Sequence, residues 1–368
     1  MIKNIQIVAF DNPNPPDYGG AVEIYYKLTA LRDLGISIDL HLFEYGKRKN
    51  FEAIEQICNR VFKYKRDMAF KNVFSRIPFI VKSRESNLLL ENLAKSTAPI
   101  LFEGIHCCSY LEHEQLKNHF KIVRTHNIEH EYYLGLYKSS KSLLKKIYYK
   151  LEAKKLKKFE SVLRGSDLIL SLSKKDAVYF KKYANTIWIP PFSERYSEVH
   201  NTEPYVLFHG NLSVEENINA LIKLIENVFS KLNLRVCIAG KDPSKAITMV
   251  IKKYKNIKLI PNPGKIKMDS LIENARCHVF YTDQNTGVKL SLVHAILTSG
   301  HIIMNSKMLF DSDFEQEIEV VDDWDKMHQT IEKCFDKENA KPRPGLRKLF
   351  DNELNLLRFL KEVESKNN

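Results

Sequence analysis

The chain has 368 residues, a length that predicts two domains of about 150 residues or more, each able to bury a core. Hydrophobic residues make up 44% of the chain and charged residues 28%, with 13 Gly and 13 Pro, which excludes collagen-like, low-complexity and disordered classes. The formal net charge is +12, and the excess lies in the first half, where residues 1–190 hold 32 of the 57 Lys and Arg but only 20 of the 45 Asp and Glu.

The sequence predicts no membrane-spanning helix, because no stretch reaches the roughly 18 uncharged apolar residues that such a helix needs. The N-terminus runs directly into a strand-like alternation without the features of an export signal, so we expect a cytoplasmic protein. The six cysteines form no CxxC pair and no spacing typical of zinc ligands, which favours reduced and mostly buried thiols.

Short apolar runs alternate with longer amphipathic ones, the pattern of α/β domains whose parallel sheets are covered by helices on both faces. In the first half we predict strands at Ile5–Phe10, Ile36–Phe43, Ile100–Glu103, Ile122–Thr125, Leu168–Ser171 and Ile187–Ile189. In the second half we predict strands at Tyr205–His209, Leu234–Ala239, Ile257–Ile260, Cys277–Tyr281 and His301–Asn305. Helices are expected between the strands.

The expected organisation is two Rossmann-like domains in succession. The first covers residues 1–190 and ends at the extended TIWIPPF run, and a polar linker follows at 191–203. The second covers 204–345, and a final helix around Leu346–Val363, within 346–368, is expected to cross back to the first domain.

One segment, Lys138–Lys158, carries nine lysines and a single acid, Glu152. Its periodicity predicts an amphipathic helix with a buried stripe beneath a lysine face, the stripe being formed by Leu144, Ile147, Leu151, Phe159 and Leu163. That face is either simply solvated or attracted to an anionic membrane surface, where each lysine contributes on the order of 1 kcal/mol. Nucleic acid ranks last as a partner, because no nucleic-acid-binding motif accompanies the charge.

Open α/β sheets bind ligands at the carboxyl ends of their strands, so residues there are site candidates. Gly19 and Gly20 open a helix after the first strand, where the backbone can approach a ligand or simply make a tight turn. Two further strand ends carry polar groups suited to proton handling or hydroxyl recognition, or else to helix capping and surface exposure. These groups are Glu103, His106, Arg124, His126, Asn127 and Glu129.

The second half offers two more strand ends. Gly210 and Asn211 leave a strand, and Ser213 with Glu216 predicts a capping box. Further on, Thr286 and Gly287 precede a helix with Lys289 in its first turn, an arrangement that can receive phosphate. The absence of a Walker lysine motif and of GxGxxG disfavours ATP hydrolysis and dinucleotide redox chemistry.

Taken in order, the segments DNPNPPDYGGAVEI, FEGIH, RTHNIEHEYY, FHGNLSVEEN, IAGKDP and TGVKLSLVHA resemble the two-Rossmann-domain (GT-B) glycosyltransferases. The similarity is strongest to family-four retaining enzymes of bacterial surface-glycan clusters, and it covers nearly the whole chain. It implies a nucleotide-sugar donor held by the second domain, a glycan or lipid-linked acceptor held by the first, retention of configuration and no metal or other cofactor. A protein of this kind would be cytoplasmic or peripheral at the inner face of the cytoplasmic membrane.

The resemblance also implies roles for particular residues. His126 would lie near the transferred sugar, and Lys289 would stabilise charge on the departing nucleotide, as a metal does in other sugar transferases. We assign to the donor side Gly19, Gly20, Gly210, Asn211, Lys241, Thr286, Gly287 and His294. We assign to the acceptor side Glu103, His106, Arg124 and Glu129.

This chain departs from the family pattern at three places. His294 stands where a ribose-binding glutamate is usual, and Thr286 stands where an acid is common. Glu215 and Glu216 occupy a loop that often carries a basic residue. Two alternatives therefore stay open beside glycosyl transfer: a catalytically inactive module that binds nucleotide-sugar or glycan, and a nucleotide-sugar epimerase.

Overall fold

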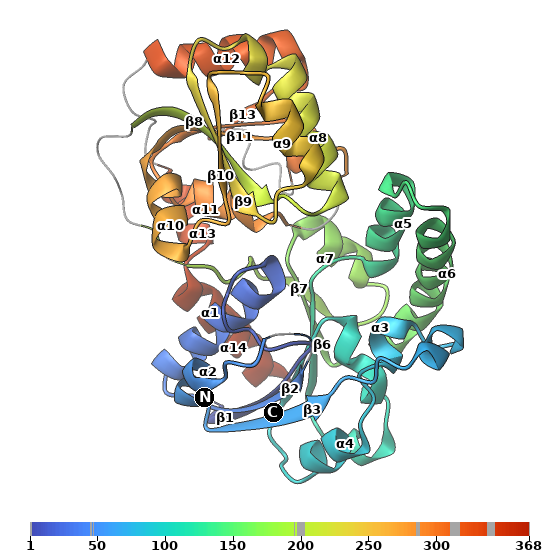
Figure 1. Ribbon diagram of the computed structural model, residues 1–368. Coiled ribbons are helices and arrows are strands. Elements are labelled where there is room, and N and C mark those ends of the chain that lie inside the picture. The colour runs from blue at the N-terminus through green and yellow to red at the C-terminus, as the bar shows by residue number, and fades with distance from the viewer. Residues whose placement is uncertain are drawn as a thin grey trace. The chain divides into compact units, whose positions relative to one another are not determined.

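The structure is a computed structural model that describes residues 2–44, 46, 48–194, 196, 203–284, 288–309, 317–336 and 343–367. It divides into two compact units, each built around its own sheet (Figure 1). The first unit contains Met1–Ser193 and the C-terminal Asp351–Asn368. The second unit contains Glu194–Asn285 and Lys289–Phe350.

The first unit has a seven-stranded parallel sheet in the order β3-β2-β1-β4-β5-β6-β7. Its strands are β1 (Asn4–Ala9), β2 (Ser37–Glu44), β3 (Arg60–Lys65), β4 (Ile100–Glu103), β5 (Lys121–Thr125), β6 (Leu168–Ser171) and β7 (Thr186–Trp188). The apolar runs of β4 and β6 are buried at every residue, as expected for central strands covered on both faces. The strand order reverses between β1 and β4, so the topological switch point lies there.

Helices cover both faces of this sheet. On one face, α1 packs together with the C-terminal helix α14 over the core that contains Leu28 and Phe359. On the other face, α4 and α7 pack over the core that contains Leu93 and Phe180. The helices are α1 (Gly19–Asp33), α2 (Glu52–Ile57), α3 (Phe79–Lys82), α4 (Asn87–Ala94), α5 (Glu129–Ser139), α6 (Leu143–Phe159), α7 (Lys174–Phe180) and α14 (Asn352–Asn367). Short 3-10 turns are η1 (Phe70–Phe74), η2 (Ile105–Tyr110), η3 (Glu114–Leu116) and η4 (Glu160–Gly165).

The second unit repeats the plan with a six-stranded parallel sheet in the order β10-β9-β8-β11-β12-β13. Its switch point therefore lies between β8 and β11. The strands are β8 (Glu203–Asn211), β9 (Arg235–Lys241), β10 (Ile257–Pro261), β11 (Ala275–Phe280), β12 (His301–Met304) and β13 (Glu319–Val320). The helices and turns are α8 (Glu215–Asn227), η5 (Phe229–Lys231), α9 (Lys245–Ile251), α10 (Lys265–Asn274), α11 (Leu290–Ile296), η6 (Ser306–Met308), α12 (Trp324–Asp336) and α13 (Pro344–Leu349).

The predicted fold class, two parallel-sheet α/β units with a C-terminal helix that returns to the first, is confirmed. Two strands were not predicted. β3 is an edge strand with the sequence RVFKYK, and only Tyr64 is buried. Its charged residues interrupt the apolar run by which a strand is predicted. β13 has two residues, too few for a periodic signal.

Two helix predictions were wrong in their extent. The final helix is two helices, because Asp351 accepts a hydrogen bond from the Leu354 amide and starts α14 anew. The basic segment is not one helix either: α5 ends at Ser139, and Ser142 caps the start of α6 by accepting from the Lys145 amide. Within the described residues, no helix is both long and apolar enough to cross a membrane. All six cysteines are buried and none forms a disulfide.

Two of the buried histidines, His41 and His278, and the half-buried His294 form no ion pair among the described residues. His41 stacks on Phe62 and bonds Tyr64 through Nδ1, whereas His278 and His294 belong to β11 and α11. One ring nitrogen of each has no hydrogen-bond partner among the described residues. Burial lowers the pKa of His41 and of His294 to about 4 and that of His278 to about 3.

We predict that stability falls as the pH drops below about 6.5. The unfolded chain takes up a proton at each of these histidines near that pH, whereas the folded chain does so only near pH 3–4. As the pH falls from the unfolded-state pKa to the folded-state pKa, each histidine therefore lowers the free energy of unfolding by about 1.4 kcal/mol per pH unit. In urea unfolding between pH 4.5 and 7, His41→Phe should reduce this slope by up to one histidine's share. An unchanged slope in His41→Phe would contradict this account.

Candidate functional site

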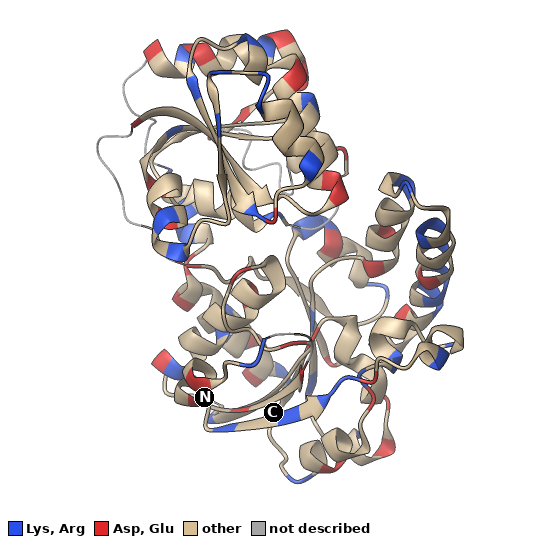
Figure 2. Ribbon diagram, viewed as in Figure 1, with Lys and Arg blue, Asp and Glu red and all other residues tan. Residues whose placement is uncertain are grey.

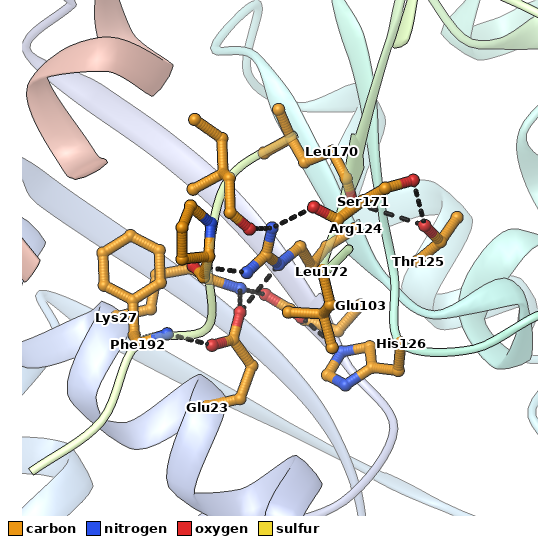
Figure 3. A network of polar contacts seen from close by, with 12 residues as sticks. Glu23, Lys27, Glu103, Arg124, Thr125, His126, Leu170, Ser171, Leu172 and Phe192 are labelled. Atoms are coloured by element: carbon orange, nitrogen blue, oxygen red, sulfur yellow. Dashed lines mark hydrogen bonds and ion pairs between the residues drawn. The ribbon is translucent and has the colours of Figure 1, made fainter. Parts of the chain in front are cut away.

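The carboxyl ends of β4 and β5 bring several predicted site residues together in the first unit (Figure 3). Glu103 is the last residue of β4 and lies opposite Arg124 of β5 in the parallel register. His126 follows β5 directly, and its ring meets the edge of the Phe10 ring with centroids 5.4 Å apart. This edge adjoins the switch point, where the fold class places ligands.

A buried network of ion pairs holds Glu103 and Arg124 in place. Lys27 Nζ lies 2.6 Å from Glu103 Oε1 and 3.0 Å from Glu23 Oε1. Arg124 Nε lies 2.7 Å from the same oxygen of Glu23, and all four side chains are at most 2% exposed. Two carboxylates and two cations balance, which is what allows charges to remain buried. Burial by itself would raise the pKa of Glu23, but Arg124 and Lys27 outweigh it and lower that pKa to about 2.

The network orients His126. Its Nε2 lies 3.0 Å from Glu103 Oε2. Burial acts to raise the pKa of Glu103, but Lys27 and the His126 hydrogen bond lower it further than that, so the carboxyl is ionised and can only accept. Nε2 of a neutral His126 therefore carries the proton and donates it, which leaves Nδ1 as an acceptor. An imidazole held in this way can accept a hydrogen bond from a substrate hydroxyl.

Arg124 has a second set of contacts that ties down the chain after β7. Its Nη1 donates to the Ile189 carbonyl at 2.7 Å and its Nη2 to the Pro190 carbonyl at 3.1 Å. The other oxygen of Glu23 accepts from the Phe192 amide at 2.5 Å. Arg124 and Glu103 are fully buried and contact protein groups, and their assignment to the acceptor side remains a prediction.

His106 and Glu129 lie beside this network. The His106 ring is 5.2 Å from the Phe10 ring, and its buried Nδ1 has no partner among the described residues. Burial, then Arg84, keeps the pKa of His106 well below its ordinary value. Glu129 opens α5 and accepts from Asn127 Nδ2 at 3.4 Å. Burial raises its pKa to about 7.

The predicted glycine pair begins α1, as expected. A Cβ at Gly20 would lie 2.6 Å from a carbon of the Phe10 ring, so glycine there lets the ring that contacts His106 and His126 pack against α1. Arg48 holds the loop before this helix by donating to the Asn12 carbonyl and pairing with Asp17. Gly19 itself is exposed.

In the second unit, Gly210 and Asn211 end β8 at the switch point, as predicted. A Cβ on the neighbouring Gly240 would lie 1.9 Å from the Gly210 carbonyl oxygen, so these two strands approach closely there. Asn211 accepts from the Ser213 amide through its side chain and from Asn217 through its carbonyl. Lys241 ends β9 beside them and is exposed.

Lys289 immediately precedes α11 and pairs with a carboxylate. Its Nζ lies 3.1 Å from Glu216 Oε1, which also accepts from Thr282 Oγ1 at 2.5 Å. The predicted capping box was wrong: α8 begins at Glu215 after Val214, with no side-chain cap. Glu216 reaches across to β11 and α11 instead, because Thr282 and Lys289 both offer donors to its carboxylate.

His294 lies on α11 with its ring 5.2 Å from Tyr196, and its buried Nε2 has no partner among the described residues. Thr286 and Gly287 lie outside the described residues, so their donor-side role stays a prediction. No group of three or more His, Cys, Asp or Glu that could hold a metal ion occurs in the described ranges.

Sequence reasoning missed Glu23, Lys27 and the part played by Glu216. Glu23 and Lys27 stand four residues apart on α1, a spacing that signals an ion pair but not a buried one. Only the packing of α1 against the sheet brings Lys27 to Glu103, 76 residues away in the chain.

We predict that Arg124→Met lowers the free energy of unfolding by about 3–5 kcal/mol, because it removes one cation from a buried ion pair. Exposed ion pairs contribute less than about 1 kcal/mol. Arg32→Met, which breaks the exposed pair with Asp33, is therefore the matched control. Chemical denaturation at pH 7 measures both, and equal losses would contradict a special role for the buried network.

No family model matches the chain. An uncharacterized 44.6 kDa protein in the cps region of Klebsiella pneumoniae is 28% identical over 326 residues, covering 82% of each chain.

Solved structures show the same architecture over nearly the full length. TarM from S. aureus is similar with a TM-score of 0.67 and 12% identity, covering 98% of this chain and 99% of that one. Anabaena HepE has a TM-score of 0.65 and 11% identity, covering 98% and 99%. WaaG, a glycosyltransferase involved in lipopolysaccharide biosynthesis, has a TM-score of 0.62 and 11% identity, covering 99% and 97%. The chain therefore has the GT-B fold of these glycosyltransferases.

Proposed function

We propose that this protein is a glycosyltransferase of hexosyltransferase type that moves a sugar from a nucleotide-diphosphate donor to a glycan or lipid-linked acceptor, with retention of configuration. The second unit holds the donor and the first holds the acceptor. No metal or other cofactor takes part in this proposal.

The observation that carries the proposal is the placement of chemical groups at both switch points. In the first unit, the charge network presents His126 with an open acceptor nitrogen beside the end of β5. In the second, Gly210 and Asn211 end β8, and Lys289 stands after β11 at the start of α11. Backbone amides and an ammonium group are suited to a diphosphate, and an imidazole acceptor is suited to a sugar hydroxyl.

The ligands of similar proteins support this choice of substrate class. The TarM structure holds UDP with fondaparinux and alpha-GlcNAc-glycerol, and the HepE structure holds UDP and glucose. The Klebsiella relative is encoded in a cps, or capsule, region, which supports a role in surface-polysaccharide biosynthesis.

In the proposed reaction Lys289 stabilises the negative charge that develops on the departing nucleotide diphosphate. To do so its ammonium must exchange part of its contact with Glu216 for a phosphate oxygen. His126 binds the transferred sugar, and Glu103 is a positioning residue that keeps the His126 ring and its proton in place. The acceptor is met at the inner face of the cytoplasmic membrane, to which the basic segment Lys138–Lys158 draws the protein.

Donor binding and nucleotide release test the function. Calorimetry with UDP- and GDP-sugars should detect binding, and acceptor extracts should release the nucleotide diphosphate. Failure to bind any nucleotide-sugar would overturn the proposal.

We predict that substitutions of Lys289 and of Glu216, the two partners of the ion pair, have opposite effects on donor affinity. Lys289→Ala should weaken binding about tenfold or more, because the phosphates lose a cation. Glu216→Gln should strengthen it severalfold, because a carboxylate no longer competes with phosphate for Lys289. Asp325→Asn, which alters an exposed pair with Lys231 in the same unit, is the control and should leave calorimetric affinity unchanged.

The Glu216–Lys289 pair also favours a second candidate, an inactive module that binds nucleotide-sugar or glycan. A lysine already neutralised by a carboxylate provides less stabilisation for a leaving group. Binding of donor without turnover on any acceptor, unaffected by Lys289→Ala, would support this module against the enzyme.

We predict that His126→Ala lowers kcat about 100-fold or more with unchanged nucleotide affinity, since positioned acid–base and hydrogen-bonding groups typically contribute this much. Glu103→Gln should lower kcat less and should mix the two tautomers of His126, visible in its ¹⁵N chemical shifts. Glu91→Gln, at an exposed position, is the matched control. An unchanged tautomer in Glu103→Gln would contradict the positioning role.

A further inference from the structure

The helix α6 has apolar side chains on two opposite faces, and only one of them is buried. Its inner face packs on the first unit through Glu152, Ala153 and Leu156. Leu144, Ile147 and Leu151, expected to be buried, are instead 80%, 51% and 53% exposed. The prediction of a buried stripe was therefore wrong for these three residues, which lie on the outside, whereas Leu163 is buried as predicted.

These exposed residues form a continuous line along the helix. Positions 144, 147 and 151 are three and four residues apart, so they fall on one face about a turn from each other. Leu143, at the first position of α6, adds a further 73% exposed leucine at the same end. Such a line of large aliphatic side chains is costly to leave in water and marks a surface that is covered in use.

A second apolar element adjoins the lower end of this line. Phe70 and Phe74 of η1 are 74% and 76% exposed and contact each other edge to face. The residue between them, Val73, accepts a hydrogen bond from Lys155 Nζ at 2.6 Å. Because Lys155 stands one helical turn after Leu151, the aromatic pair is fastened beside the end of the leucine stripe.

The exposed charges along α6 are of one sign. Figure 2 shows Lys and Arg positions along the length of α6. The one acid of the segment, Glu152, faces inward, where it accepts from the Phe79 amide and from Lys155 at 2.7 Å each. The exposed face of α6 therefore combines apolar side chains with cations and carries no carboxylate.

We propose that α6 lies in the headgroup layer of an anionic lipid bilayer, with Leu144, Ile147 and Leu151 inserted and the Phe70–Phe74 pair inserted beside them. A helix with an apolar stripe and lysine flanks lies in the plane of such a surface, where the lysine stems extend to the phosphates. This docking deepens the proposed function, which places the acceptor at the membrane, but it needs neither donor nor acceptor.

The charge pattern selects lipid over other occupants. A second copy of this chain laid on the same face would bring lysines against lysines, which is unfavourable. An anionic bilayer instead offers both an apolar layer and negative headgroups. Binding then has two components: attraction by the lysines, which salt screens, and insertion of the apolar side chains, which salt does not weaken.

The experiment is sedimentation of the full chain with vesicles of phosphatidylcholine and phosphatidylglycerol, at 0.1 M and 0.5 M NaCl. Wild type should bind at both salt concentrations. L144Q/I147Q/L151Q should bind at 0.1 M but partition about tenfold or more weakly at 0.5 M. L354Q/L357Q, which changes two exposed leucines of α14, is the matched control and should behave as wild type.

A dye reports the depth of insertion directly. Because the native cysteines are buried, Ile147→Cys is labelled selectively with an environment-sensitive fluorophore, and its emission should shift to the blue on anionic vesicles. Leu354→Cys should show no shift. Complete release of wild type at 0.5 M NaCl, or no shift at position 147, would overturn insertion. A dimer abolished by L144Q/I147Q/L151Q would overturn the lipid assignment. Neither result bears on donor binding, so the proposed function is tested separately.

Discussion

The first unit depends on one buried ammonium group. Lys27 Nζ joins Glu23 and Glu103, and through them Arg124 and the partly exposed His126. The two carboxylates and the two cations neutralise one another, so the loss of any of these four would leave a charge unpaired in a medium of low polarity. The same contacts join α1, β4, β5 and the chain after β7, which links the stability of the fold to the orientation of His126.

At the carboxyl ends of its strands, the second unit has, among the described residues, an ion pair in place of a buried network. Lys289 and Glu216 form a single pair in which the lysine keeps part of its surface in solvent. Such a pair exchanges partners at modest cost, because water and an incoming anion replace the broken contact. In the same unit, desolvation lowers the pKa of His209, His278 and His294, and no carboxylate pairs with any of the three rings within the described residues. The charged network in the first unit fixes one imidazole, which suits the orienting role proposed for that site. The Lys289–Glu216 pair in the second unit can open, which suits the proposed uptake of an anion.

The helix α6 buries a charged residue and exposes apolar ones. Its inner face buries Glu152, a charged residue, because the Phe79 amide and Lys155 satisfy the carboxylate. Its outer face exposes leucine and isoleucine beside lysine. A helix that buries a charge and exposes apolar side chains is stable only if other contacts hold it. Here α5 and the core around Ala153 and Leu156 provide these contacts. The outward apolar side chains are then free to meet a partner of their own polarity.

The sequence by itself determined the α/β class, the two sheets and the strand ends at which the candidate residues stand, because apolar runs and their spacing are local properties. It placed β4 and β6 to the residue. Which face of α6 is buried was decided only in three dimensions, since both faces carry apolar residues and a helical periodicity does not reveal which one meets the core. The pairing of Lys27 with Glu103, and of Glu216 with Lys289, was likewise decided by tertiary packing, because each pair joins side chains more than 70 residues apart. Short-range pattern carries no information about such contacts, and they are the ones that give the site its charge.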